Sequence, residues 1–183
     1  MWKKIGIGAA ALIVLLLIVV ATRPDTYHVE RSTTISATPE VVYGNVADFH
    51  KWEAWSPWEK LDPKMKKTYD GTQGSVGASY AWNGNDDVGE GKMTILSVEP
   101  NKRIDIDLHF IRPFEDNPKN GFVFDATGKE TKVTWKMDGK NGFMGKVMSL
   151  FMDMDKMIGK DFEKGLADLK KVSETAPAPA AAN

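Results

Sequence analysis

One stretch near the C-terminus decides the fold: 145-GKVMSLFMDMDKMIGKDFEKGLADLKKV-172. Its apolar residues recur at intervals of three and four, which places them on one face of a helix. Charged residues fill most of the other positions. At 1.5 Å per residue, such a helix is about 40 Å long, more than a small domain needs for a core alone. The pattern therefore predicts one long amphipathic helix that the rest of the domain surrounds.

The first half of this predicted helix is unusually rich in methionine. Methionines stand at positions 144, 148, 152, 154 and 157. Their flexible, polarizable side chains fill gaps in cores and also line adaptable apolar surfaces. Two interpretations follow, ordinary core packing or a stripe that faces a ligand, and the first is the commoner meaning of apolar helical spacing.

Composition narrows the class of protein. The chain has 183 residues, a formal net charge of −1 and no cysteine. This length suits one domain with a sizeable core. The charges are interspersed and form no basic stripe, so nucleic acid is not an expected partner. Without cysteine, the chain has neither disulfides nor thiolate chemistry.

The N-terminus carries an uncharged apolar run at residues 5–21, preceded by Lys3 and Lys4 and followed by Arg23. These residues make about 25 Å of helix, at the short end of what spans a bilayer core of roughly 30 Å. We expect an uncleaved single-pass membrane anchor, with flanks, at residues 1–25. The preceding lysines place the domain outside the cytoplasm. The alternative is a signal peptide cleaved near Ala21, which gives a secreted or periplasmic protein.

The middle of the chain predicts an antiparallel sheet. A first strand at 26–35 and a short helix through 41–47 precede strand candidates at 65–70, 77–83, 89–99, 103–110, 121–126 and 131–138, with turn residues between them. Apolar and polar residues alternate in 103–110 and 131–138, as in a sheet with one wet face. The order of elements predicts an α+β fold, a sheet curled around the final helix. The domain then spans 26–172, and the Ala- and Pro-rich tail at 173–183 is expected to be disordered.

Catalytic and metal-binding motifs give no clear signal. His28, His50 and His109 are far apart in the sequence, and none has a second ligand type at helical spacing, so no metal or cofactor is expected. Ser56 and Glu59 have the spacing of a capping box around Pro57, which predicts a helical turn there. Trp52, Trp55 and Trp58 follow Phe49 at three-residue intervals. They form either a lid over the core or an aromatic rim at the mouth of a pocket.

Several segments together carry a family resemblance: 35-ISATPEVV-42, 48-DFHKWEAWSPW-58, 69-YDG-71, 77-GASYAW-82, 89-GEGKMTI-95 and the C-terminal helix. Over residues 26–172 the chain resembles the SRPBCC superfamily of START-like, helix-grip proteins. This superfamily includes the polyketide cyclase/dehydrase and lipid-transport group. The resemblance identifies a fold better than an activity, because one fold hosts many functions.

The resemblance implies a sheet of about seven antiparallel strands that grips the long helix and leaves an apolar cavity between them. Family members bind lipids, sterols or polyketides, and a few catalyse cyclisation or dehydration. An N-terminal membrane segment is a departure from most soluble members. No catalytic residue of the family can be carried over position by position.

We therefore expect membrane-tethered binding or transport of a hydrophobic small molecule, lipid or polyketide-like, in that cavity. The cavity candidates are Trp82, Ile106, Leu108, Phe110, Arg112, Phe122, Phe124, Trp135, Met137, Met148, Phe151 and Met154. Arg112 either orients a polar head group or is an ordinary surface arginine. One alternative is a cyclase- or dehydratase-like enzyme, for which Tyr80, Asp107 and His109 are the groups to inspect. The other is an envelope protein-interaction module, which predicts a filled core and an exposed apolar patch.

Overall fold

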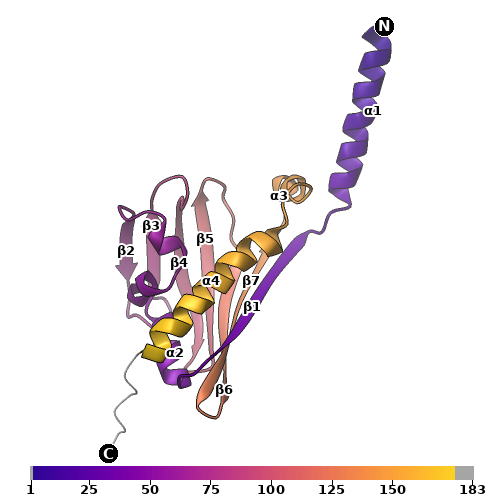
Figure 1. The fold of residues 1–183 in the computed structure, drawn as a ribbon. Coiled ribbons are helices and arrows are strands. Elements are labelled where there is room, and N and C mark those ends of the chain that lie inside the picture. The colour runs from indigo at the N-terminus through magenta and orange to yellow at the C-terminus, as the bar shows by residue number, and fades with distance from the viewer. Residues whose placement is uncertain (1, 176–183) are drawn as a thin grey trace, which may run out of the picture.

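The computed structural model describes residues 2–175, with side chains for residues 6–8 and 11–175. A long sheet wraps around one side of the final helix (Figure 1). In chain order the elements are α1 (Trp2–Ala21), β1 (Thr26–Ile35), α2 (Pro39–Ala47), the 3₁₀ turns η1 (Phe49–Ala54) and η2 (Trp58–Lys60), β2 (Lys66–Asp70), β3 (Ser79–Asn83), β4 (Glu90–Glu99), β5 (Arg103–Arg112), β6 (Lys119–Thr127), β7 (Glu130–Lys140), α3 (Phe143–Met148) and α4 (Met154–Thr175).

The seven strands form one antiparallel sheet in the order β1-β7-β6-β5-β4-β3-β2. Each predicted strand is present, with ends that differ by at most two residues from the expected ones. Because β1 and β2 are the two edges, the segment with α2, η1 and η2 crosses from one edge of the sheet to the other. The α+β helix-grip prediction is confirmed.

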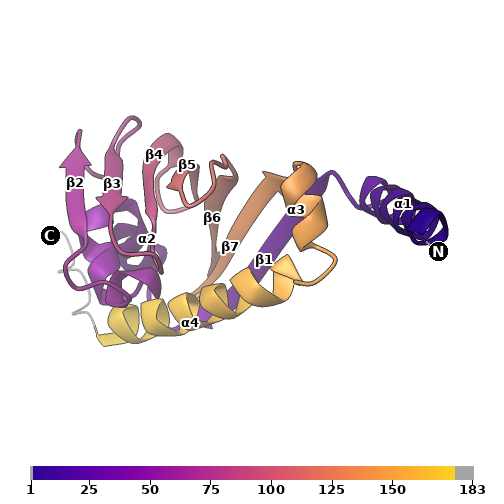
Figure 2. The same ribbon diagram turned by 90° about the horizontal axis from the view of Figure 1, so that it is seen from above.

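The expected alternation within the strands decides where the core lies. Ile104, Ile106 and Leu108 of β5 are at most 5% exposed, and Trp135 of β7 is 1% exposed. These side chains point to the concave face of the sheet, where they meet α2, η1 and α4 (Figure 2). A sheet with one apolar face needs such a cover to keep that face from water.

The middle of α4 is fixed to the sheet by an aromatic contact. The ring of Phe162 stacks on Trp135, with centroids 4.0 Å apart and planes 7° from parallel. One turn later, Gly165 lets the helix backbone approach this indole. A Cβ at this position would lie 2.8 Å from Trp135 and 3.1 Å from Pro57. The absence of a side chain at Gly165 therefore sets the depth at which α4 packs.

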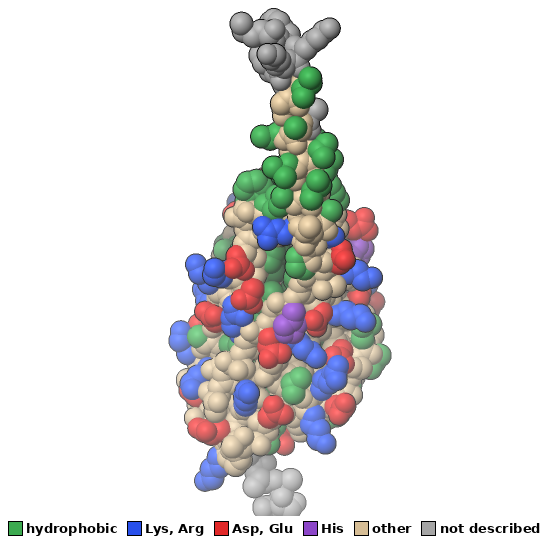
Figure 3. Space-filling model, turned by 90° about the vertical axis from the view of Figure 1, so that its right-hand side faces the viewer, with side chains coloured by type: hydrophobic (Ala, Val, Ile, Leu, Met, Phe, Trp, Pro, Cys, Tyr) green, Lys and Arg blue, Asp and Glu red, His purple; other side chains and the backbone are tan. Residues whose placement is uncertain are grey.

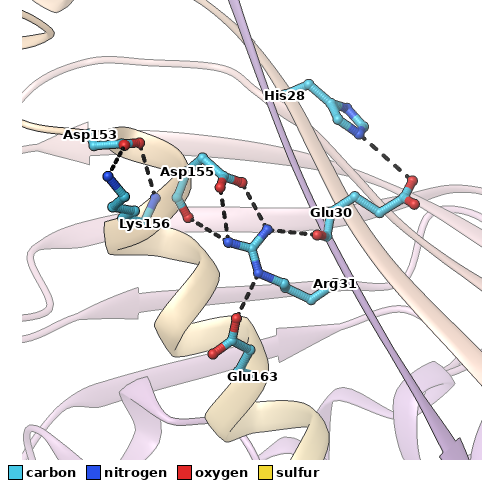
Figure 4. A network of polar contacts seen from close by, with 7 residues as sticks. All are labelled: His28, Glu30, Arg31, Asp153, Asp155, Lys156 and Glu163. Carbon is cyan, nitrogen blue, oxygen red and sulfur yellow. Dashed lines mark hydrogen bonds and ion pairs between the residues drawn. The ribbon is translucent and has the colours of Figure 1, made fainter.

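The first half of α4 is held to the edge strand β1 by charges (Figure 4). Arg31 donates to Asp155 from Nη1 at 2.8 Å and to Glu163 from Nε at 2.8 Å. It also donates to the backbone oxygens of Glu30 and Asp155. Gly159 leaves room for the guanidinium against the helix, since a Cβ there would lie 2.0 Å from Nη2. One arginine thus bridges two turns of α4.

The prediction of a single helix over 145–172 was wrong. The chain forms α3, leaves helical conformation near residues 149–153, and begins again as α4. Asp153 explains the break, because its carboxylate accepts a hydrogen bond from the backbone N–H of Lys156 and so caps the start of α4. As a result, Met144, Met148 and Met152 are exposed by 58%, 39% and 39% and do not form a buried stripe.

The predicted tail also began too early, since α4 continues to Thr175. Residues 176–183 of that tail lie outside the described residues. The tail carries a Pro- and Ala-rich composition only from residue 176 onward, whereas Ser173 is buried against the domain.

At the other end, α1 projects away from the domain (Figure 1), and its described side chains are almost all apolar and exposed (Figure 3). It covers residues 5–21, where the sequence predicts a membrane anchor. However, among the residues that the structure describes, no helix is long and apolar enough to cross a membrane. A membrane-spanning anchor at residues 5–21 stays a prediction from the sequence.

We predict opposite effects for two glycine-to-alanine substitutions in helices. Gly165→Ala gains helix propensity but overpacks Trp135 and Pro57, so it should destabilise the protein by about 1–3 kcal/mol. Gly44→Ala in α2 meets only Lys51 Nζ at 3.9 Å, and it should stabilise by up to about 1 kcal/mol. Urea unfolding measures both. A Gly165→Ala variant at least as stable as the unmodified protein would contradict the packing described above.

Candidate functional site

A cavity of about 430 Å³ lies between the concave face of the sheet and the first half of α4. This volume falls within the roughly 300–1,000 Å³ that is usual for small-molecule sites. Its wall comes from β3, β4, β5 and β7 on one side, from Trp52 and Trp58 at the end, and from Met154, Met157 and Ile158 of α4. Met157 of α4 is 43% exposed and Asp86 of the β3–β4 loop is fully exposed. The cavity therefore opens to solvent where these two residues lie.

A second depression, of about 550 Å³, lies on the outer side between β1 and α4. Its lining is largely charged and includes Arg31, Glu163 and Lys170. These groups already pair with one another or with the neighbouring backbone. Despite its larger volume, this depression lacks an apolar wall, so we place the candidate site in the first cavity.

The structure brings together only part of the predicted cavity set. The residues in the wall are Trp82, Leu108, Phe110, Arg112, Trp135, Met137 and Met154. Three other candidates, Ile106, Phe122 and Phe124, are at most 3% exposed and belong to the packed core. Met148 and Phe151 belong neither to the cavity wall nor to the core, because the break between α3 and α4 leaves them on the surface. Contact of any of these residues with a ligand stays a prediction.

The tryptophan cluster combines the two interpretations made from the sequence. Trp52 and Trp55 are at most 2% exposed, and their indole N–H groups donate to the backbone oxygens of Val46 and Asn45. They close the core. Trp58 is only partly buried and lines the cavity, as does one face of Trp52. The aromatic cluster is thus both core and cavity wall.

A buried acid lies in the wall beside Tyr80. The carboxylate of Glu59 accepts a hydrogen bond of 2.6 Å from the Tyr80 hydroxyl and forms an ion pair of 2.5 Å with Lys67 Nζ. The Glu59 side chain is 4% exposed. Burial alone would lower the pKa of Lys67, but the pairing with Glu59 raises it. A buried carboxylate is retained only where such partners compensate its charge.

This arrangement corrects the capping-box prediction. The predicted helical turn is present as the 3₁₀ turn η2 at residues 58–60, but it has no side-chain cap. Glu59 instead points inward to Tyr80 and Lys67. The spacing of Ser56 and Glu59 matched a local motif, whereas the partners of Glu59 come from β2 and β3. No local signal in the sequence identifies them.

Polar groups at the open side of the cavity are largely paired. Arg112 donates to the Gly84 carbonyl at 2.7 Å and to Asn83 at 3.2 Å, and it pairs with Asp86 at 3.6 Å. It lines the cavity, but its guanidinium is engaged with the β3–β4 loop. Tyr27 donates to Asp116 at 3.2 Å, and burial together with this carboxylate raises the pKa of Tyr27.

Of the three enzyme candidates, only Tyr80 faces the cavity. Burial, followed by its hydrogen bond to Glu59, raises the pKa of Tyr80 far above the ordinary tyrosine value. Asp107 and His109 lie on the opposite face of β5, and His109 is 3.4 Å from Glu115 on the surface. Neither contributes to the cavity wall. The enzyme interpretation therefore depends on Tyr80 and its partner.

Several wall residues were not among the sequence candidates. They include Tyr27, Glu59, Met93, Asn120, Ile158 and Asp161, whereas Trp58 and Met157 were considered only as members of the aromatic cluster and the methionine stripe. Alternation along β4 and helical spacing in α4 carried a signal for Met93, Met157 and Ile158. The polar members carried none, because polar residues on otherwise apolar faces are recognised only once their partners are known. Asn120, for example, accepts a hydrogen bond of 2.7 Å from the Trp135 indole.

The fold and the cavity define a helix-grip protein with a largely apolar cavity between its sheet and its final helix. In sequence, residues 26–174 match the family described as polyketide cyclase / dehydrase and lipid transport. The chain belongs to this family. A search of curated protein sequences finds no match.

Solved structures show the same fold at low sequence identity. Ginseng major latex-like protein 151 from Panax ginseng superimposes with a TM-score of 0.61 at 17% identity, covering 84% of this chain and 100% of that one. The Zhui aromatase/cyclase from a Streptomyces species gives 0.59 at 12% identity, covering 81% and 94%. The Aha1 dimer from Colwellia psychrerythraea gives 0.58 at 16%, covering 81% and 97%.

The Tyr80–Glu59 hydrogen bond should contribute measurably to stability. Tyr80→Phe removes the donor to a buried carboxylate and should cost about 1–3 kcal/mol at neutral pH. Tyr43→Phe is the matched control, because the Tyr43 hydroxyl takes part in none of the described hydrogen bonds. Chemical unfolding of the two variants measures the difference. Equal stabilities would show that the Glu59 carboxylate does not need this donor.

Alkaline pH should destabilise the protein through the same tyrosine. Because folding raises the pKa of Tyr80, its contribution is complete below the unfolded value of about 10 and is lost as pH rises toward the folded value. The free energy of unfolding should therefore fall above about pH 10, and less steeply in Tyr80→Phe. Urea unfolding at several pH values, with tyrosinate absorbance, measures both. A Tyr80 that ionises near its ordinary pKa in the folded protein would exclude this account.

Proposed function

We propose that this protein binds a hydrophobic small molecule, lipid or polyketide-like, in the cavity between its sheet and α4. The observation that carries the proposal is the cavity itself, which has the volume of a ligand site and a mainly apolar and aromatic wall. Apolar surface that stays in contact with water is unfavourable, and a bound apolar ligand would remove that contact. Membership of a family named for polyketide cyclases and lipid transport supports the same assignment.

The shape of the wall favours a flat or chain-like apolar ligand. Trp82, Phe110 and Trp135 contribute aromatic rings to the wall from three alternate strands, β3, β5 and β7. Opposite them, Met154 and Met157 of α4 supply flexible side chains, which adapt to ligands of different outline. A rigid aromatic wall facing an adjustable one suits binding and release of a bulky apolar molecule.

Acid–base chemistry in the same cavity is the second candidate, and the Tyr80–Glu59 pair favours it. A hydroxyl next to a buried carboxylate is a recognised arrangement for proton transfer. However, the raised pKa keeps Tyr80 protonated at neutral pH, and its proton is directed to Glu59 rather than into the cavity. These features fit a hydrogen-bonding role better than a catalytic one.

The protein-interaction alternative expects a filled core and an exposed apolar patch. Phe143, Met144 and Phe151 do expose apolar surface near α3. The core is hollow rather than filled, which argues for a small-molecule ligand. Location of the domain outside the cytoplasm, with or without cleavage near Ala21, stays a prediction from the sequence.

A bulky substitution in the cavity should abolish ligand binding. Leu108 lines the cavity, and Leu108→Trp places an indole in the space. Ile111→Trp is the matched control, because Ile111 lies on the outer face of the same strand and is 50% exposed. With 1-N-phenylnaphthylamine as a neutral fluorescent probe and dodecanol as competitor, Leu108→Trp should weaken binding at least tenfold, about 1.4 kcal/mol.

The same experiment separates the alternatives. Circular dichroism and thermal unfolding check that Leu108→Trp is folded, because overpacking can cost about 1–3 kcal/mol. Met137→Trp, from the neighbouring part of the wall, serves if it is not. Equal probe binding by the Leu108 and Ile111 variants would refute the proposal. Mass spectrometry of ligand recovered after incubation favours binding if its mass is unchanged, and chemistry if it is altered.

A further inference from the structure

The cavity wall carries more negatively charged than positively charged side chains. Its carboxylates are Glu59, Asp86, Asp87, Asp116 and Asp161, and among the described residues its one cationic side chain is Arg112. Like charges that surround an apolar space create a potential that attracts the opposite charge and repels their own. The wall therefore discriminates between ligands by the charge of their polar end, if the charges are not already neutralised.

Some of these charges are neutralised within the protein. Lys67 compensates Glu59 at 2.5 Å, and Arg112 compensates Asp86 at 3.6 Å. Arg112 itself is further engaged by Glu90 at 3.8 Å and by the Gly84 carbonyl. The cation of the wall is thus surrounded by acceptors from the protein, which leaves it little capacity to hold an anionic head group.

The charges of Asp116 and Asp161 are not neutralised in this way. Asp116 accepts hydrogen bonds from the Tyr27 hydroxyl and from the backbone of Asn117, both neutral donors, so its charge remains. Asp161 has no ion pair or side-chain hydrogen bond to any of the residues that the structure describes, whereas its neighbours Asp153 and Asp168 on the same segment are paired. It is partly buried on α4, one turn after Met157, and burial raises its pKa while Lys164 acts in the opposite direction.

From this distribution we infer that the cavity selects hydrophobic ligands with a positively charged end, a protonated amine or a quaternary ammonium group, which Asp161 receives. This inference rests on the proposed function, since it assigns the head group of the ligand that the cavity binds. A cationic head group pairs here with the partly desolvated carboxylate of Asp161, and the hydrophobic part of the same ligand lies against the aromatic wall. A carboxylate head group would instead meet the carboxylates of Asp116 and Asp161, and that of Asp87, which also has no ion pair with the residues that the structure describes.

The test compares three ligands with the same chain: dodecyltrimethylammonium, dodecanol and dodecanoate, each below its micellar concentration. They compete with 1-N-phenylnaphthylamine for the full-length protein, and only the signal that Leu108→Trp abolishes is counted as cavity binding. We expect the ammonium compound to bind at least tenfold more tightly than dodecanoate, with dodecanol between them. Asp161→Asn should remove most of the ammonium preference, measured as the ratio of the dodecyltrimethylammonium and dodecanol affinities of the same variant.

Asp168→Asn is the matched control on α4, because Asp168 pairs with Lys60 and Lys171 outside the cavity. It should bind all three ligands as the unmodified protein does. Since burial disfavours the Asp161 charge, Asp161→Asn is expected to fold normally, which thermal unfolding checks.

The outcomes are distinguishable. Dodecanol binding without an ammonium preference, or a preference that survives Asp161→Asn, overturns the charge selection and leaves the proposed function intact. Failure of all three ligands to displace the probe from the cavity overturns both.

Discussion

The contact between Phe162 and Trp135 is the one on which the cavity depends. It holds α4 against β7 at a ring separation of 4.0 Å, and Gly165 allows the backbone to come this close. Toward the N-terminus from this contact, Met154, Met157 and Ile158 of α4 line the cavity. Solid packing at one end of the helix and a hollow at the other are therefore two consequences of the same docking geometry.

The polar contacts of the cavity wall arise because some charged groups are removed from water and need partners within the protein. Glu59 lies where the crossing segment meets the sheet, so its carboxylate is removed from water and needs both Tyr80 and Lys67. At the open side, Arg112 ties the β3–β4 loop to the end of β5. Most charges near the cavity thus stabilise the protein, and those that lack a partner among the described residues stand out as groups that can respond to a ligand.

Regular local patterns were readable from the sequence, and long-range partners were not. Alternation in β5 and β7 correctly placed Leu108, Trp135 and Met137 on the inner face, because each strand repeats with a period of two. The same reasoning extended the final helix through residues 149–153, since helical spacing takes no account of the capping carboxylate of Asp153. Phe122 and Phe124 were correctly inward-facing, but only the path of α4 decides which inward residues border the hollow. Glu59 shows the limit most clearly, as its partners lie on β2 and β3.

The attachment of α4 to the rest of the domain depends on forces of two different kinds. Phe162, Leu166 and Leu169 are held by apolar contacts, which added salt does not weaken. The first turns instead depend on Arg31, whose acidic partners Asp155 and Glu163 are more than half exposed, so dissolved ions screen them. Near the C-terminal end the Lys60–Asp168 pair is screened too, but apolar contacts remain there, so ionic strength acts most strongly on the N-terminal end of the helix. That end borders the cavity, so the wall that a ligand must pass is also the part whose attachment loosens in concentrated salt.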